Sequence, residues 1–143
     1  MGKVRNILDK KRPDIFSIPP DYTVYEALEL MVENNVGALL VMEDEKLVGI
    51  FTERDYARKV ILKGKASKDT LIREIMVEQP VTVGPESTIE ECMQLMTNKF
   101  IRHLPVTSLG TVVGVISIGD LVKFIIEEQK FIIENLEHYI TGT

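Results

Sequence analysis

The chain has 143 residues and a mass of 16.2 kDa, the size of one compact domain or of two small, mutually dependent ones. Hydrophobic residues make up 45% and charged residues 27%, which is typical of a folded globular protein and excludes a disordered or fibrous chain. The net charge of −5 disfavours general nucleic-acid binding. Apolar runs such as 38–42 are far shorter than the roughly 20 residues of a membrane span. Because the basic N-terminus also lacks the apolar core of a secretory signal, we expect a cytoplasmic protein with no membrane contact.

The first half of the chain carries the signals of a small unit in which strand, helix, hairpin and helix follow one another. Before this unit, the apolar spacing in 4–9 predicts a short helix. The segments that predict the unit are the apolar stretch 15–18, a helix opened by the capping box Thr23-x-x-Glu26, the β-rich runs 38–42 and 47–51, and a helix from Thr52 to near Gly64. A short helix is expected within 67–76, where the chain leaves the unit.

The second half repeats the first at an offset of 65 residues. Between 14–61 and 79–126 there are 11 identities over 48 ungapped positions, where average composition gives roughly 3. In the second copy the equivalent segments are the apolar stretch 81–83, the β-rich runs 104–107 and 112–116, and a helix from Ser117. The duplicated unit is β-α-β-β-α, and about 50 residues can hardly close a core alone, so the two copies are expected to pack through their apolar strand faces. The predicted segments are an N-terminal segment 1–13, repeat 1 at 14–64, a linker at 65–78, repeat 2 at 79–128 and a C-terminal helix extension at 129–143.

The most informative motif is Gly-apolar-apolar-(Thr/Ser)-x-x-Asp, which occurs in register in both copies, at 49–55 and 114–120. One interpretation is a capping box, in which the hydroxyl and the carboxylate bind free N–H groups of the helix that follows. The other is a nucleotide site, since a helix N-terminus can bind phosphate and an aspartate can accept hydrogen bonds from a ribose diol.

The doubled unit and its motif resemble a tandem pair of cystathionine β-synthase (CBS) domains, known as a Bateman module. The segments that carry this resemblance are Val36-Gly37-Ala38-Leu39-Leu40-Val41, Thr52-Glu53-Arg54-Asp55-Tyr56-Ala57-Arg58-Lys59, Ile101-Arg102-His103-Leu104-Pro105-Val106 and Val115-Ile116-Ser117-Ile118-Gly119-Asp120-Leu121-Val122. The resemblance is closest to stand-alone two-repeat CBS proteins of bacteria and plant organelles. It implies an α/β fold that binds adenine ligands, such as AMP, ATP, NAD or S-adenosylmethionine, in clefts between the repeats and regulates another protein.

The resemblance also implies roles for individual residues. Asp120 and Asp55 would each hold a ribose, Ser117 and Thr52 would lie at the phosphate, and Val115 and Ile50 would line the base. The small residues Val36, Gly37 and Ala38 would complete the base pocket of the Asp120 cleft, while Arg102 and His103 would neutralise phosphate. In the Asp55 cleft, Arg102 and His103 stand where the small pair would be, so its base pocket is expected to be occluded or shifted.

Several of these residues also have a plain structural interpretation. Arg54 and Arg58 lie one helical turn apart and would reach a phosphate, or simply form a solvated helix face. His103 would contact phosphate or pack as a neutral group, and His138 is expected at the surface. The single cysteine, Cys92, excludes an intrachain disulfide and a cysteine metal cluster, and its expected role is packing.

The last helix is expected to run from Ser117 to about Ile140 with one broad apolar face, which predicts a partner. The resemblance implies a disc-like homodimer formed through helices; the alternative is a helix that folds back on its own module. Plant relatives of this type are associated with thioredoxins, so the resemblance offers a thioredoxin-like protein or a regulated enzyme as partner.

The sequence therefore predicts a nucleotide-binding regulatory module with no catalytic residues, no metal and no catalytic cofactor. An enzyme with Asp55 and Asp120 as acid–base groups is the first rival, but nothing positions a nucleophile or a metal beside them. The second rival is a ligand-independent dimeric scaffold that acts through the C-terminal helix.

Overall fold

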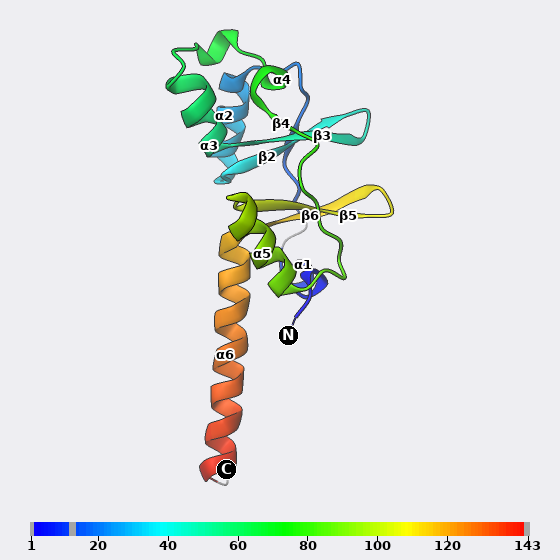
Figure 1. Cartoon of the computed structure of the whole chain (residues 1–143), viewed down its shortest axis with the longest axis vertical. Helices are drawn as coiled ribbons and strands as arrows, with labels where there is room; N and C mark the ends of the chain where they lie inside the picture. Colours follow the sequence, from blue (N-terminus) through cyan, green and yellow to red (C-terminus); the bar gives the residue numbers. More distant parts are fainter. Residues whose placement is uncertain (1, 12–13, 142–143) are drawn as a thin grey trace.

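The computed structural model describes residues 2–11 and 14–141, which form two stacked α/β units and a long helix that runs away from both (Figure 1). In chain order the elements are α1 (Val4–Lys10), β1 (Ser17–Ile18), α2 (Val24–Asn34), β2 (Ala38–Glu43), β3 (Lys46–Thr52), α3 (Glu53–Asp55), the π-helix η1 (Tyr56–Ile61), the 3-10 helix η2 (Ser67–Asp69), α4 (Ile72–Ile75), β4 (Val77–Glu78), α5 (Ile89–Lys99), β5 (His103–Ser108), β6 (Thr111–Ser117) and α6 (Ile118–Thr141). The short helices predicted near residues 4–9 and 67–76 are thus present, the second as two brief turns.

The two predicted hairpins are confirmed, and they are equivalent in register. β2 and β3 pair antiparallel with Ala38 opposite Thr52, and β5 and β6 pair with His103 opposite Ser117. Each hairpin has a bulge at the equivalent step, after Val41 and after Val106. The 65-residue offset seen in the sequence therefore describes the backbone as well.

The strand expected at the start of each repeat forms fully only in the first. β1 pairs parallel to β2, with Ile18 opposite Val41. In the second repeat the equivalent pairing is a single parallel bridge between Val83 and Val106, so the strand predicted at 81–83 is reduced to that bridge. The first sheet has the order β1-β2-β3-β4 because the linker adds β4, whereas the second contains only β5 and β6.

Each repeat has its own apolar cluster, and each cluster is completed by a helix from outside the duplicated unit. In the first repeat, side chains of α2, β2 and β3 pack with Ile72 and Ile75 of α4. In the second repeat, side chains of α5, β5 and β6 pack with Val4 and Ile7 of α1. Helix α1 precedes repeat 1 in the chain but belongs to the core of repeat 2.

The expectation that the two repeats pack through their apolar strand faces is wrong for one face of each sheet. Leu39, Val41 and Phe51 lie in the cluster formed with the helices of their own repeat. Because side chains alternate along a strand, the opposite face of the sheet carries Leu40 and Ile50, which are buried outside that cluster.

The helices α1 and α4 dock in the same way. The Val4 N–H donates to the Ser87 carbonyl at 2.9 Å, and the Ile72 N–H donates to the equivalent Tyr22 carbonyl at 2.8 Å. A Cβ atom built on Gly114 would lie 2.7 Å from Leu8 Cδ2, and one built on Gly49 would lie 2.7 Å from Met76 Sδ. The glycine that opens each motif thus leaves room for the docked segment.

The helix predicted to begin at Thr52 does begin there, but it changes character after one turn. α3 passes into the π-helix η1, in which the Leu62 N–H donates to the Ala57 carbonyl five residues earlier at 3.1 Å. Its counterpart α6 is a regular helix of 24 residues and projects beyond the second repeat (Figure 1). Within residues 2–11 and 14–141, none of the helices combines the length and the apolar character needed to cross a bilayer.

Candidate functional site

Both copies of the motif fold as capping boxes at a strand-to-helix junction. The Thr52 N–H and hydroxyl each donate to Asp55 Oδ2 at 3.0 Å, and the Asp55 N–H donates back to Thr52 Oγ1 at 3.3 Å. In the second copy the Ser117 N–H donates to Asp120 Oδ2 at 2.9 Å, and the Asp120 N–H donates to Ser117 Oγ at 3.2 Å. The capping interpretation is confirmed, and it fixes both carboxylates at the first turn of a helix.

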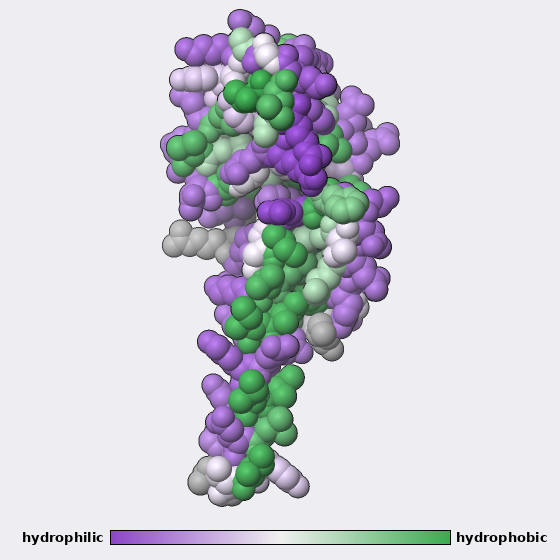
Figure 2. Space-filling model, turned by 60° about the vertical axis from the view of Figure 1, so that its left-hand side comes forward, coloured by the Kyte–Doolittle hydropathy of each residue, from purple (hydrophilic) through white to green (hydrophobic). Residues whose placement is uncertain are grey.

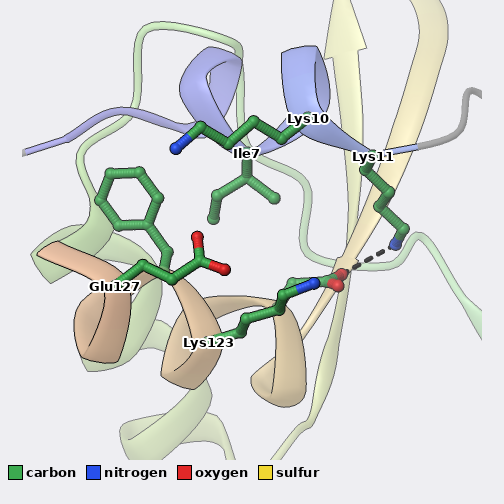
Figure 3. A pocket seen from close by; sticks show the side chains of 7 residues that line it. Ile7, Lys10, Lys11, Lys123 and Glu127 are labelled. Carbon is green, nitrogen blue, oxygen red and sulfur yellow. Dashed lines mark hydrogen bonds and ion pairs between the residues drawn. The ribbon is translucent and has the colours of Figure 1, made fainter. Parts of the chain in front are cut away.

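Each motif aspartate is also paired with a lysine. Lys59 Nζ lies 3.4 Å from Asp55 Oδ1 and donates to the Ile75 carbonyl at 3.0 Å. Lys11 Nζ lies 2.8 Å from Asp120 Oδ2 (Figure 3). It also donates to the Val115 carbonyl at 2.7 Å. Neither lysine is among the site residues predicted from the sequence.

The two carboxylates differ in how open they are to a ligand. The Asp55 side chain is 11% exposed and Asp120 is 23% exposed. Burial alone would raise the pKa of Asp120, but the hydrogen bonds from Lys11 and Ser117 outweigh burial and hold that pKa below its ordinary value. Asp120 is therefore an ionised acceptor at neutral pH.

A pocket lies beside Asp120, between α1 and the first turns of α6 (Figure 3). Its lining combines three ammonium groups, two carboxylates and an apolar wall: Ile7, Lys10, Lys11, Asp120, Lys123, Phe124 and Glu127. Lys10 Nζ lies 5.8 Å from the centre of the Phe124 ring, a cation–π distance. The surroundings of Asp120 are thus strongly polar on the side of the N-terminal helix.

The segments before the second strand of each repeat meet across the two units. The Gly37 carbonyl accepts from the Glu53 N–H at 3.1 Å, and the Arg102 carbonyl accepts from the Ile118 N–H at 2.9 Å, so each segment is tied to the start of its helix. A Cβ atom built on Gly37 would lie 3.7 Å from His103 Cε1. The small residue of repeat 1 and the histidine of repeat 2 are therefore neighbours.

We call the place where the segments 36–38 and 101–103 meet the seam. His103 lies in this seam and is mostly neutral. Burial, with help from the nearby charge of Lys11, lowers the pKa of His103 below its ordinary value despite the nearby carboxylates of Asp120 and Glu53. Val36 and Ala38 are half-buried, and Val36 packs on the apolar cluster of its own repeat. Ile50 and Val115 occupy equivalent places on the sheets, opposite Leu40 and Pro105.

The predicted arginines have different surroundings. The Arg54 guanidinium donates from Nη1 to the Phe100 carbonyl at the end of α5, which links the two repeats. Arg58 is exposed on η1, and Arg102 is exposed beside His103. The structure thus brings Asp120, His103 and Gly37 to one seam and leaves Arg54 bound to backbone.

The described residues offer little for other chemistries. Across 2–11 and 14–141, His, Cys, Asp and Glu side chains nowhere gather in threes that would hold a metal ion. Cys92 is fully buried, and burial raises the pKa of its thiol to about 11, so it packs as a thiol rather than reacting as a thiolate.

The sequence does contain a signal for Lys11, in a second internal match. Val4-Arg5-x-Ile7-Leu8 matches Ile72-Arg73-x-Ile75-Met76 at an offset of 68, three more than the offset of the repeats. This second match indicates that 4–8 plays for repeat 2 the part that 72–76 plays for repeat 1. It places the residues just after it, including Lys11, next to the motif of repeat 2.

Comparisons with known proteins agree with this geometry. A family model described as CBS domain matches residues 4–62 and 72–127. The chain is 44% identical over 127 residues to the CBS domain-containing protein CBSX3, mitochondrial, of Arabidopsis thaliana, and the match covers 85% of this chain and 62% of that protein. The chain thus spans less than two thirds of this plant relative.

Solved structures give the same result. A CBS-domain protein from Burkholderia ambifaria MC40-6 superposes with a TM-score of 0.87 at 45% identity, covering 90% of this chain and 96% of that one. A CBS domain protein from Pyrobaculum aerophilum, solved in complex with AMP, superposes with a TM-score of 0.74 at 26% identity, covering 83% and 89%. With both repeats matched by the family model and the fold shared with these structures, the chain belongs to the CBS domain family and carries two CBS repeats.

Proposed function

We propose that this chain is a regulatory module that binds an adenine nucleotide between its two repeats, mainly in the cleft of Asp120. The observation that carries the proposal is the placement of Asp120: an ionised, partly exposed carboxylate on the first turn of α6, beside the seam where Gly37 and His103 meet. The AMP complex of the Pyrobaculum relative supports an adenine nucleotide as the ligand class.

In this proposal each residue has a role that its chemistry suits. Asp120 accepts hydrogen bonds from the ribose diol, and Ser117 lies at the phosphate with the N-terminus of α6. Val115 lines the base together with Val36, Gly37 and Ala38, and the exposed Arg102 neutralises the phosphate. His103 adds little positive charge at pH 7, because its pKa is lowered. AMP, NAD and ATP all stay candidates.

The Asp55 cleft is the weaker of the two sites in this proposal. The Asp55 side chain is only 11% exposed, against 23% for Asp120, so a ligand reaches its carboxylate less easily. Ile50, the equivalent of Val115, is also buried. The phosphate-binding roles predicted for Thr52, Arg54 and Arg58 stay predictions.

Isothermal titration of nucleotide-free protein tests the proposal directly. AMP, ATP, NAD and S-adenosylmethionine would each be titrated into the wild type, Asp120→Ala and, as the matched control in the other repeat, Asp55→Ala. We expect at least one ligand to bind the wild type, to bind Asp55→Ala with little change and to lose most of its affinity for Asp120→Ala. Equal binding by the wild type and Asp120→Ala would refute the assignment of the site.

We further propose that the module forms a homodimer through α6. Figure 2 shows a green apolar band along most of this helix. Eight of its large hydrophobic side chains are between 47% and 87% exposed: Val122, Ile126, Phe131, Ile132, Ile133, Leu136, Tyr139 and Ile140. So long an apolar stripe is rarely left in water on a single chain.

Sedimentation velocity tests the dimer. Leu136→Glu lies beyond the body of the molecule and spares both apolar clusters, so it should convert a dimer into a folded monomer. Lys130→Gln changes the net charge by the same amount on another side of α6 and should leave the dimer intact. A monomeric wild type, or a dimer in both variants, would refute this interface.

The exposed face of α6 also favours a second function, a dimeric scaffold that acts without a ligand. In that case no nucleotide would give heat in the titration, and Asp120→Ala would not affect dimerisation. For both functions, the regulated partner and the cytoplasmic location stay predictions, and the Arabidopsis relative is named as mitochondrial.

A further inference from the structure

The two motif aspartates obtain their lysine partners from different parts of the chain. In repeat 1, Lys59 follows Asp55 by four residues on the same helical stretch. The equivalent residue in repeat 2, at the 65-residue offset, is Phe124, which has no charge. The cation at Asp120 is instead Lys11, which directly follows α1 and lies 109 residues away in the sequence.

The ammonium group of Lys11 occupies one of the two carboxylate oxygens that the ribose would use. It donates to Asp120 Oδ2 at 2.8 Å and to the Val115 carbonyl at 2.7 Å. The same Oδ2 already accepts the Ser117 N–H at 2.9 Å. Since a carboxylate oxygen has about two lone-pair positions for hydrogen bonds, Oδ2 is filled, and a ribose diol that binds one hydroxyl to each carboxylate oxygen needs the position that Lys11 holds.

We propose that Lys11 is a displaceable counter-ion of the nucleotide site, which the ribose of an adenine nucleotide must push away from Asp120. The inference rests on the nucleotide-binding function proposed above and adds its means of regulation. Without ligand, Lys11 holds the N-terminal helix against the motif of repeat 2. With ligand, the ribose replaces Lys11 and the segment that carries it is released.

The surroundings of Lys11 suit such an exchange. Its side chain is 37% exposed, so the displaced ammonium group has water to enter. Its backbone N–H closes the last turn of α1, with the Ile7 and Leu8 carbonyls at 3.1 and 3.3 Å. Loss of the side-chain contact therefore acts on the end of α1, while Val4 and Ile7 keep the rest of that helix in the core of repeat 2.

The lysine at Asp55 in repeat 1 is held differently from Lys11. Lys59 is anchored on η1, four residues from Asp55, and its ammonium group also binds the Ile75 carbonyl. Displacing it would free only a side chain, because no separate chain segment is attached. Nucleotide binding in the Asp120 cleft therefore acts on α1, whereas nucleotide binding in the Asp55 cleft does not.

The test is the affinity of AMP for Lys11→Met, which keeps most of the unbranched side chain and removes its charge. Partly exposed ion pairs contribute little, so we expect AMP to bind Lys11→Met about two- to fivefold more tightly than the wild type. The ratio of the two AMP affinities should fall toward one as the salt concentration rises, because salt screening then weakens the pair of Lys11 and Asp120 in the wild type. Structural damage would weaken binding instead of tightening it.

Two variants serve as matched controls. Lys10→Met removes the neighbouring charge, which lies over the Phe124 ring and makes no bond to Asp120. Lys59→Met removes the equivalent charge in repeat 1. Both should bind AMP with nearly wild-type affinity. In hydrogen exchange, AMP should speed exchange of the Lys11 amide in the wild type and have no such effect in Lys11→Met.

The same measurements distinguish the displacement of Lys11 from nucleotide binding at Asp120, on which it depends. AMP binding that is unchanged or weakened in Lys11→Met would refute displacement and leave the nucleotide site standing. A wild type and a Lys11→Met variant that both fail to bind AMP and the other adenine ligands would refute the site itself, and the inference with it.

Discussion

The glycines that open the two motifs offer a sharp test of how α1 and α4 dock. Gly49 and Gly114 are equivalent, both are buried, and neither has a positive φ. Replacing either with alanine therefore adds one methyl group without backbone strain. The two positions differ only in what that methyl group would meet.

At Gly49 the new Cβ meets the backbone. It would lie 2.7 Å from Met76 Sδ and 3.0 Å from the Val77 carbonyl oxygen, and β4 is held by its pairing with β3. Met76 can rotate away, but the carbonyl cannot move without disturbing that pairing. Overpacking of this kind costs about 1 to 3 kcal/mol.

At Gly114 the new Cβ meets only the side chain of Leu8, with Cδ2 at 2.7 Å and the other atoms at 3.5 Å or more. A leucine end can turn, at a cost of about 0.5 to 1.5 kcal/mol for a poor rotamer. Alanine also returns about 0.4 to 1 kcal/mol by restricting the unfolded chain. Gly114→Ala should therefore be close to neutral.

Urea denaturation of both variants and the wild type measures the difference. We expect the midpoint for Gly49→Ala to fall clearly, with Gly114→Ala within error of the wild type and the slopes unchanged. Equal losses for the two variants, or a larger loss for Gly114→Ala, would show that the docked segments do not contact the glycines as described.

Two further predictions concern titratable groups. Cys92 should not react with a thiol reagent in the native protein at pH 8 and should react fully in urea, because burial raises its pKa to about 11; rapid native labelling would contradict its burial. The pKa of Asp120 is lower in the folded than in the unfolded chain, so its pairing stabilises the fold above its ordinary pKa of 3.8, and this stabilisation is lost as the pH falls below that value. Thermal melts from pH 6 down to about pH 2.5 should therefore show a shallower loss for Asp120→Asn than for the wild type, and parallel curves would contradict the ion pair with Lys11.

The parts of the fold that the sequence predicts are those with local signals. The hairpins follow from alternation within six or seven residues around a turn, and the caps at Thr23, Thr52 and Ser117 follow from residues three apart. The comparison of the chain with itself adds the repeat. The strand expected at 81–83 is wrong except for one bridge, since a short apolar stretch does not say whether a neighbour will pair with it.

The candidate site is predicted less completely, for the same reason. Asp120 stands out because its motif occurs twice, but its partner Lys11 lies 109 residues away, and only the short match between 4–8 and 72–76 points to it. The sequence predicts Arg54 on a helix face, at a phosphate or in solvent, and the structure gives it the Phe100 carbonyl of the other repeat. Contacts between distant segments depend on the docking of α1 and on the stacking of the repeats, which only the tertiary structure supplies.

The length of α6 has a mechanical consequence. Asp120 stands on the first turn of a helix of 24 residues, and the far end, with Tyr139 and Ile140, extends well past the second repeat (Figure 1). At 1.5 Å per residue the helix is about 36 Å long, so a tilt of about 5° at its base moves its tip by about 3 Å. The helix is therefore a lever arm, which turns a slight adjustment at the carboxylate into a displacement as large as a side chain at its apolar end.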